Sequence, residues 1–227
     1  MGWRQPAHLT TPVSQPFQMR AATPFLVLDG LCLRFPHCEL FSQLSAEVPH
    51  GVTLVRGGES RGKTSLLRIV AGELSANAGS VRVNGTDVQA NPDTWRQTVF
   101  WVSPRTDAYD AISAADYFEN VRQVHSHFDD RLLQDLVDSL TIAPHLDKPL
   151  YMLSTGSRRK VWLAAALASG APVTLLDEPF AALDSQSIAC VKQQLTLAAS
   201  QHMRVFLLAD YEAPVGVPLV GVIDLGD

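Results

Sequence analysis

The sequence has little charge and few cysteines, and each shortage excludes a class of protein. Charged residues make up 18% of the 227 residues and the formal net charge is -5, so no basic surface for nucleic acid is expected. The three cysteines are odd in number and match no zinc-ligand spacing. We therefore expect Cys32, Cys38 and Cys190 to be buried thiols in a reducing cytosol, and neither disulfide partners nor metal ligands.

Long apolar runs are also missing. The most apolar stretch, residues 161–176, is interrupted by Gly170 and Pro172 and is shorter than the about 20 residues that a bilayer span requires. The N-terminus lacks the continuous apolar segment of a secretory signal peptide. We expect a chain without a membrane span, which can still dock on a membrane protein.

The N-terminal residues differ in composition from the rest of the chain. Residues 1–23 are rich in Pro, Gln, Thr and Ser and have no sustained periodicity, which predicts a flexible tail. Met19 is a second candidate start of the chain. Residues 24–227 are then expected to form the folded domain, and that length is enough to bury a substantial core.

The clearest motif runs from Gly57 to Thr64, where GGESRGKT fits the phosphate-loop pattern G-x-x-x-x-G-K-[ST]. The β-branched and apolar residues 52–55 predict a buried strand before it, and apolar residues at helical spacing predict a helix after Gly62. Backbone N–H groups of such a turn can surround a phosphate chain. Lys63 would reach the β- and γ-phosphates, and the Thr64 hydroxyl would ligate Mg²⁺. The alternative is a glycine-rich turn with a surface lysine.

The order of strands and helices predicts an α/β fold with a mostly parallel sheet, that is, a phosphate-loop NTPase core. Before the loop and shortly after it, short strands and an Asn-Gly turn predict an N-terminal antiparallel β-lobe at residues 25–29, 31–35, 40–48 and 81–83. Later strands are expected at residues 98–102, 173–176, 205–208 and 217–224. Helices are expected at residues 114–124, 129–140, 157–168 and 185–199, and a helical subdomain at about 105–160.

A second motif, VTLLDEP, supplies acidic residues at the end of a predicted strand. Asp177 stands at the C-terminal end of the strand 173–176 and is followed by Glu178. Two adjacent carboxylates at a strand tip are unfavourable without a cation, so we assign Asp177 to Mg²⁺. Glu178 is the candidate general base for an attacking water. The alternative is a strand that ends in a solvated acidic turn.

Further motifs carry a family resemblance. LSTGS at residues 153–157 resembles the LSGGQ signature of the nucleotide-binding subunits of ATP-binding-cassette (ABC) transporters, and AALD at residues 181–184 resembles the D-loop of that family. Phe35 matches the aromatic residue that stacks on adenine. The resemblance covers residues 25–224 in the family's order. Within the family, LFSQL before the loop and LLDEPFAALD after it are similar to the ATPase subunit of cytochrome c maturation haem exporters.

The resemblance implies an ABC ATPase fold, ATP with Mg²⁺ as ligands, and ATP hydrolysis coupled to transport. It implies a head-to-tail dimer with a second ABC subunit, identical or different, and a transmembrane permease partner on the cytoplasmic face of the inner membrane. Glu178 and Lys63 would be catalytic, while Thr64 and Asp177 would hold the metal. The residues expected to contact nucleotide are Phe35, Gly57, Gly58, Glu59, Ser60, Arg61, Gly62, Lys63, Thr64, Ser65, Ser154, Thr155, Gly156 and Asp184.

Departures from the family pattern fall on positions that affect turnover. Arg105 stands where the family has its Q-loop glutamine, and an arginine cannot accept hydrogen bonds or ligate Mg²⁺. Ala209 stands where the family has a histidine that contacts the γ-phosphate. In the signature, Thr155 and Ser157 replace Gly and Gln. Two functions therefore stay open: an ATPase with reduced turnover, and a degenerate subunit that binds ATP in a regulatory or structural role.

Overall fold

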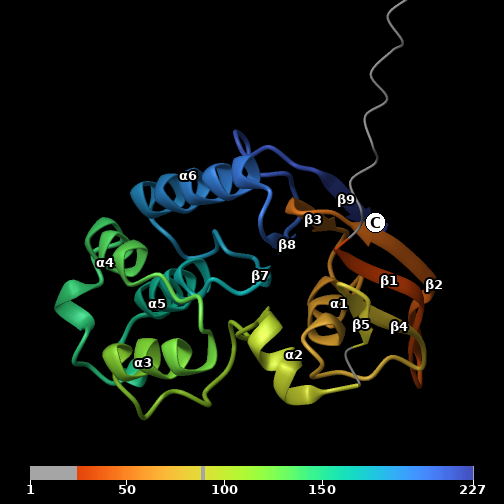
Figure 1. Ribbon diagram of the computed structural model, residues 1–227, viewed down its shortest axis with the longest axis horizontal. Coiled ribbons are helices and arrows are strands. Elements are labelled where there is room, and N and C mark those ends of the chain that lie inside the picture. The colour runs from red at the N-terminus through yellow and green to blue at the C-terminus, as the bar shows by residue number, and fades with distance from the viewer. Residues whose placement is uncertain (1–24, 88–89, 227) are drawn as a thin grey trace, which may run out of the picture.

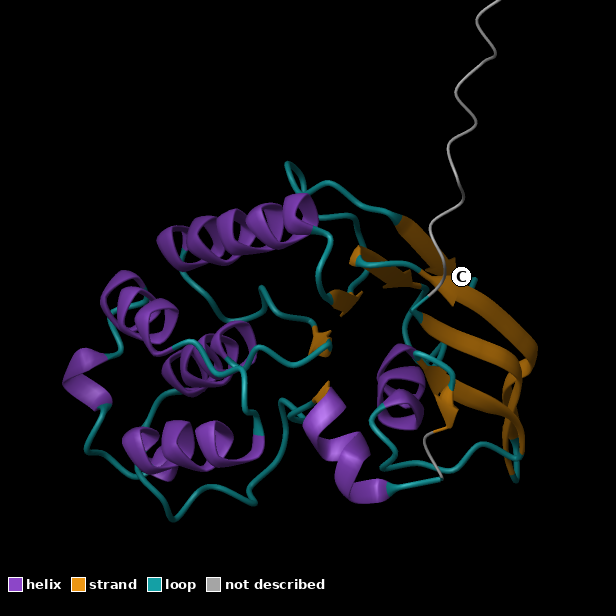
Figure 2. Cartoon of the chain, viewed as in Figure 1, coloured by secondary structure: helices purple, strands orange, loops and turns teal. Residues whose placement is uncertain are grey.

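The computed structural model of the chain describes residues 25–87 and 90–226. The tail predicted at residues 1–23 lies outside these ranges. Two sheets and a set of helices are present. The strands of the first sheet lie at one end of the molecule, and the helices α3 (Ala114–Val124), α4 (Asp130–Ser139) and α5 (Thr155–Ala168) lie at the other (Figures 1 and 2).

The N-terminal sheet is antiparallel and has the strand order β2-β1-β4-β5. Its strands are β1 (Leu26–Phe35), β2 (Cys38–Val48), β4 (Ala78–Val83) and β5 (Thr86–Asp87). The predicted strands 25–29 and 31–35 are one continuous strand, within which Gly30 adopts a φ of 60° and lies at an irregularity of the pairing with β2 and β4. The predicted β-lobe is thereby confirmed.

The second sheet is parallel and has the strand order β6-β7-β8-β3-β9. Its strands are β3 (Gly51–Arg56), β6 (Val99–Phe100), β7 (Val173–Asp177), β8 (Val205–Ala209) and β9 (Gly221–Asp224). Strands β3, β7 and β8 are buried along nearly their whole length, as their continuous apolar sequences predict for a sheet covered on both faces.

Helices cover both faces of this parallel sheet. The α-helices are α1 (Lys63–Val70), α2 (Pro92–Thr98), α3 (Ala114–Val124), α4 (Asp130–Ser139), α5 (Thr155–Ala168) and α6 (Ser185–Gln201). Two short 3-10 helices, η1 (Ala143–His145) and η2 (Leu150–Met152), precede α5. Helix α1 shares a core with both sheets, whereas α3 to α6 share a second core on the other side of the parallel sheet.

Helix α2 and strand β6 differ from the sequence prediction. A strand was expected at residues 98–102, but the chain is helical through Thr98 and only Val99–Phe100 pair with β7. The Asn91 side chain accepts a hydrogen bond from the Thr94 N–H at 3.1 Å, and Pro92 occupies the first helical turn. Asn followed by Pro is a helix-start signal that the sequence prediction did not use.

The cysteines are free thiols, as expected, but the prediction that all three are buried is wrong. Cys38 is exposed, and Cys32 and Cys190 are only half-buried. Cys38 is the first residue of β2, which is an outer strand of the antiparallel sheet. At the outer corner of a sheet, no neighbouring element covers the side chain.

Candidate functional site

The phosphate loop joins β3 to α1, and its geometry depends on glycine. Gly62 has a φ of 93°, and a Cβ placed on it would lie 2.9 Å from the Phe41 ring. Any other residue would be strained there and would also collide with the β-lobe. Because α1 begins at Lys63, the turn leads directly into the N-terminus of a helix.

Several backbone N–H groups of this turn are not used within the protein. Gly58 donates its N–H to the Gly226 carbonyl at 2.9 Å. In the described part of the chain, the N–H groups of residues 59, 60 and 62 form no hydrogen bond to a protein acceptor. The first N–H groups of α1 likewise have no partner within the helix. Unpaired donors at a helix N-terminus bind anions, and a phosphate chain satisfies them.

The Lys63 ammonium group lies within the same turn. Its side chain is buried, and Nζ donates to the carbonyl oxygens of Gly57 at 2.7 Å and Gly58 at 2.9 Å. Nζ also lies 3.8 Å from the centroid of the Tyr211 ring, which comes from the segment after β8. The loop thus holds a positive charge against its own first two carbonyl groups.

Thr64 and Asp177 come together although 113 residues separate them in sequence. The Thr64 hydroxyl donates to Oδ2 of Asp177 at 2.8 Å. Burial raises the pKa of the Asp177 carboxyl, and the Glu178 carboxylate adds to the rise, while the Thr64 hydrogen bond and the charges of Arg159 and Lys63 oppose it. An exposed hydroxyl beside a half-buried carboxylate offers oxygen ligands of the kind that suit a hard divalent cation such as Mg²⁺.

Glu178 follows directly and adopts an uncommon backbone conformation. Its φ is 45°, and its N–H donates to the Ala209 carbonyl at 2.8 Å. The residue is half-buried beside Asp177. A non-glycine residue with a positive φ is held by its surroundings, and such residues gather at functional sites.

The predicted signature segment forms the start of α5. The Ser154 side chain accepts a hydrogen bond from the Ser157 N–H at 3.1 Å, so the helix begins two residues earlier than the predicted 157. Ser154 and Thr155 are exposed, whereas Gly156 packs on the Ala182 carbonyl, which a Cβ would approach to 2.5 Å. The helix therefore presents its N-terminal donors on the surface.

Two other predicted positions lie apart from this segment. Phe35 ends β1 and is 43% exposed, so its ring is accessible for stacking. Asp184 caps α6 by accepting the Ser187 N–H at 2.8 Å, and Lys160 from α5 donates to the same carboxylate at 2.6 Å. These two hydrogen bonds hold the pKa of Asp184 well below its usual range.

The two departures from the family pattern have distinct surroundings. Ala209 is fully buried in β8, where it pairs with Asp177, and offers no polar side chain. Arg105 is exposed in the loop after β6. Asp210 and Tyr211 follow Ala209 and border the phosphate loop. Burial raises the pKa of the Asp210 carboxyl, and the charge of Glu178 adds to this rise.

Sequence reasoning missed Tyr211 and Arg159 as members of the site. Tyr211 lies two residues after a buried strand, and a polar aromatic residue at that place is a signal that could have found it. Arg159 donates to the carbonyl oxygens of Asp177 and Glu178, from α5. No local pattern marks an arginine whose partners are main-chain carbonyl groups.

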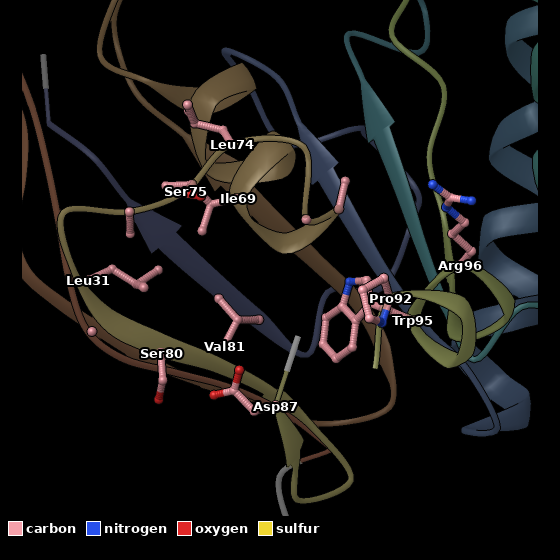
Figure 3. Close-up of a pocket in the computed structure, with 14 residues that line it drawn as sticks. Leu31, Ile69, Leu74, Ser75, Ser80, Val81, Asp87, Pro92, Trp95 and Arg96 are labelled. Carbon is pink, nitrogen blue, oxygen red and sulfur yellow. The ribbon is translucent and has the colours of Figure 1, made fainter. Parts of the chain in front are cut away.

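A separate cavity of about 330 Å³ lies between the β-lobe, α1 and α2 (Figure 3). Leu31, Val81 and Ile69 form part of its wall, with Trp95 and Arg96 from α2. The Trp95 indole N–H donates to the Val70 carbonyl at 2.8 Å and so fixes α2 against α1. Residues of the phosphate loop do not line this cavity.

The strand β3, the glycine-rich loop with its buried lysine, and the carboxylate at the end of β7, one strand beyond β8 in the same parallel sheet, define a phosphate-loop NTPase. The sequence model of the ABC transporter family matches residues 41–181, which is more than half of the chain. The chain therefore belongs to the ABC transporter family, as one of its ATP-binding subunits. The resemblance and the fold inferred from the sequence are confirmed.

Two curated relatives carry the same printed name, cytochrome c biogenesis ATP-binding export protein CcmA. The one from Aromatoleum aromaticum is 33% identical over 216 residues, covering 92% of this chain and 99% of its own. The one from Pseudomonas savastanoi is 33% identical over 178 residues, covering 78% of this chain and 84% of its own. The sequence similarity to the ATPase subunits of cytochrome c maturation haem exporters is thus confirmed.

The fold has known counterparts. A putative ABC transporter ATP-binding protein from Pyrococcus furiosus superposes with a TM-score of 0.70 at 21% identity, covering 88% of this chain and 96% of that chain. At this identity the likeness concerns the fold alone. Within the two described ranges, no helix combines the length and apolar character needed to cross a lipid bilayer.

Proposed function

We propose that this chain hydrolyses Mg-ATP as the nucleotide-binding subunit of an ABC transporter, pairing head to tail with a second ABC subunit and driving a membrane-spanning partner. The observation that carries the proposal is the Thr64–Asp177 contact of 2.8 Å beside Glu178 and the phosphate loop. It unites a metal-binding pair, a candidate base and an anion cradle at the carboxyl ends of the parallel strands β3 and β7, which flank β8.

Each residue has a distinct role in this proposal. The N–H groups of residues 59–62 and the Lys63 ammonium group would bind the β- and γ-phosphates. Thr64 and Asp177 would hold Mg²⁺, which supplies charge neutralisation for the transferred phosphoryl group. Glu178 would accept a proton from the attacking water through its carboxylate. Phe35 would stack on the adenine ring.

The dimer is proposed from the signature segment. Ser154 and Thr155 are exposed at the start of α5, where N–H donors and the positive end of the helix dipole face solvent. Together with Gly156 and Asp184, they would close over ATP that is held by the phosphate loop of a second subunit. That subunit is either a copy of this chain or a different cassette.

The docking site for the membrane partner is proposed between the two halves of the molecule. A groove of about 490 Å³ lies between the C-terminal end of α1, strand β6 and helix α3. Tyr109 and Val124 are exposed large side chains on its wall. The helical subdomain at about 105–160 would carry one side of this groove and place the chain at the cytoplasmic face of the inner membrane.

The names of the relatives favour an export role in cytochrome c biogenesis for this chain. A degenerate, non-hydrolysing subunit is the second candidate, favoured by the exposed Arg105 and the buried Ala209. Glu178 distinguishes the two, because a subunit that only binds ATP does not need a base at that position. Steady-state ATP hydrolysis in the presence of the membrane partner separates the two candidates.

Calorimetric titration of the purified chain with Mg-ATP tests the proposal. Wild-type protein is expected to bind, and Lys63→Ala is expected to lose at least tenfold in affinity because a charge-assisted contact to phosphate is removed. Lys148→Ala, an exposed lysine outside the site, is the control and should bind as wild type does. Equal affinities of wild type and Lys63→Ala for Mg-ATP would overturn the assignment of the loop as the phosphate-binding site.

A further inference from the structure

The loop that carries Glu178 is held in an unfavourable conformation. It runs from the end of β7 to the start of α6, and two of its non-glycine residues have positive φ values, Glu178 at 45° and Ala182 at 60°. Such conformations persist only where surrounding contacts determine them.

Helix α5 contacts this loop at three places. Gly156 packs so closely on the Ala182 carbonyl that a Cβ would approach it to 2.5 Å. Lys160 donates to the Asp184 carboxylate at 2.6 Å. Arg159, between them, donates from one guanidinium nitrogen to the carbonyl oxygens of Glu178 and Asp177, the latter at 3.4 Å. The first turns of α5 and the loop therefore form one connected unit.

The surroundings of Arg159 do not favour folding stability. Its guanidinium is half-buried and burial lowers its pKa. Its Nε–H has no acceptor among the described residues. A desolvated cation with an unpaired donor costs free energy, and an apolar side chain of similar length would avoid that cost. The contact to the two carbonyl groups therefore calls for a role beyond packing.

We propose that Arg159 is a positioning residue that ties the backbone of Glu178 to the signature helix. ATP that is held by the partner subunit and contacts Ser154 of this chain then sets the Glu178 carboxylate for turnover. This inference rests on the proposed function. Because one guanidinium bridges two consecutive carbonyls at the point where φ turns positive, a shift of α5 is transmitted directly to Glu178. One nucleotide site then controls turnover at the other.

The test compares Arg159→Ala and Arg159→Lys with Arg158→Ala in the purified full chain. Arg158 is the matched control, since it lies on the same helix but pairs with Asp110 at 2.9 Å and donates to the Leu150 carbonyl at 3.2 Å. Arg159→Ala should lower kcat at least tenfold and leave the calorimetric Kd for Mg-ATP within twofold. Arg159→Lys should recover part of kcat, because one ammonium group reaches one of the two carbonyls.

Arg158→Ala should keep kcat within about threefold, because its contacts do not touch the catalytic loop. The inference is overturned if Arg159→Ala keeps the wild-type kcat, or if it raises Kd and lowers kcat by equal factors. It is also overturned if Arg158→Ala lowers kcat as much as Arg159→Ala. Should Arg159→Ala fail to fold, the Lys variant decides: an unchanged kcat counts against the inference.

Amide hydrogen exchange gives a readout that does not require turnover. In wild-type protein, Mg-ATP should slow exchange in peptides that contain residues 178–184, and Arg159→Ala should abolish that protection while protection of the phosphate loop remains. Protection of residues 178–184 that survives in Arg159→Ala overturns the inference. If wild-type protein binds Mg-ATP but never hydrolyses it, the proposed function fails, and the exchange result still decides the role of Arg159.

Discussion

Lys63 directs its ammonium group at the face of the Tyr211 ring, with 3.8 Å between Nζ and the ring centroid. An ammonium group has three N–H donors, and the carbonyl oxygens of Gly57 and Gly58 accept two of them. The third direction is therefore covered by the ring. A phosphate that approaches Lys63 competes with Tyr211 for that place.

Replacing Tyr211 with Ala should consequently tighten Mg-ATP binding. The gain is expected to be about twofold to fivefold, the factor that corresponds to a cation–π contact of about 0.5–1 kcal/mol. Tyr211→Phe keeps the ring face and should bind as wild type does. Calorimetric titration of the three proteins measures the effect, and weaker binding by Tyr211→Ala would mean that the ring supports the nucleotide.

Gly62→Ala should abolish Mg-ATP binding. The added Cβ would lie 2.9 Å from the Phe41 ring, and φ at this position is 93°. Gly85→Ala is the matched control, because φ is 78° there and no atom lies within 4 Å of the added Cβ. Both variants carry a left-handed strain of about 1–2 kcal/mol. Only Gly62→Ala should lose binding, as measured by calorimetry beside thermal unfolding; equal losses in both would contradict the account.

Asp177→Asn should raise the unfolding temperature of the nucleotide-free protein and remove its stabilisation by Mg-ATP. Burial raises the pKa of the Asp177 carboxyl, so the folded state disfavours its charged form. The contribution of Asp177 to the free energy of unfolding therefore declines as the pH rises above the pKa of the group in the unfolded chain. Removing the charge relieves that cost but also removes a metal ligand.

Asp224→Asn is the control, and its unfolding temperature is expected to change in the opposite direction to that of Asp177→Asn. Arg56 hydrogen-bonds to this carboxylate at 2.6 Å and lowers its pKa, so removing the charge should lower the unfolding temperature at neutral pH. Differential scanning fluorimetry with and without Mg-ATP measures both variants. A lower unfolding temperature for Asp177→Asn without nucleotide would contradict the assignment.

His125 should make the fold sensitive to mild acid. Its ring is 6% exposed, and Nδ1 lies 3.2 Å from the Gln97 carbonyl oxygen. Burial lowers the pKa of His125, and the positive charge of Arg204 adds to this, against the Gln97 hydrogen bond. The neutral ring is favoured in the folded state, so its stabilising effect is present above the unfolded pKa of 6.5 and is lost as pH falls below it.

The free energy of unfolding should therefore fall between pH 7 and pH 5 more steeply in wild type than in His125→Gln. Denaturant titrations at several pH values measure the slope. At pH 8 the variant is expected to be the less stable of the two, because the ring contact with Phe100, 5.7 Å between centroids, is lost. Equal slopes would show that other groups dominate the acid response.

The sequence predicted the parts of the site that lie on contiguous patterns. The loop from Gly57 to Thr64 and the strand end at Asp177 could be read locally, because each function needs neighbouring residues at fixed spacing. Tyr211 and Arg159 could not, since their roles come from contacts between distant segments. A cation–π contact and a bond to main-chain carbonyls leave no motif in one sequence.

The fold was predicted to a similar extent. Long apolar strands such as β7 and β8 were placed to within one residue, because their burial is continuous. Helix α2 was missed, since its short run of residues has only Trp95 buried and shows no helical apolar period. The predicted strand 217–224 is confined to Gly221–Asp224, where pairing with β3 begins.

ATP hydrolysis by Glu178→Gln tests the central claim most directly. We predict that the variant loses at least about 10²-fold in turnover, because the general base is removed, while it retains Mg-ATP and accumulates as an ATP-bound dimer in light-scattering measurements. Glu212→Gln, an exposed neighbouring carboxylate, should keep the wild-type rate. A Glu178→Gln protein that turns over ATP at the wild-type rate would contradict the account.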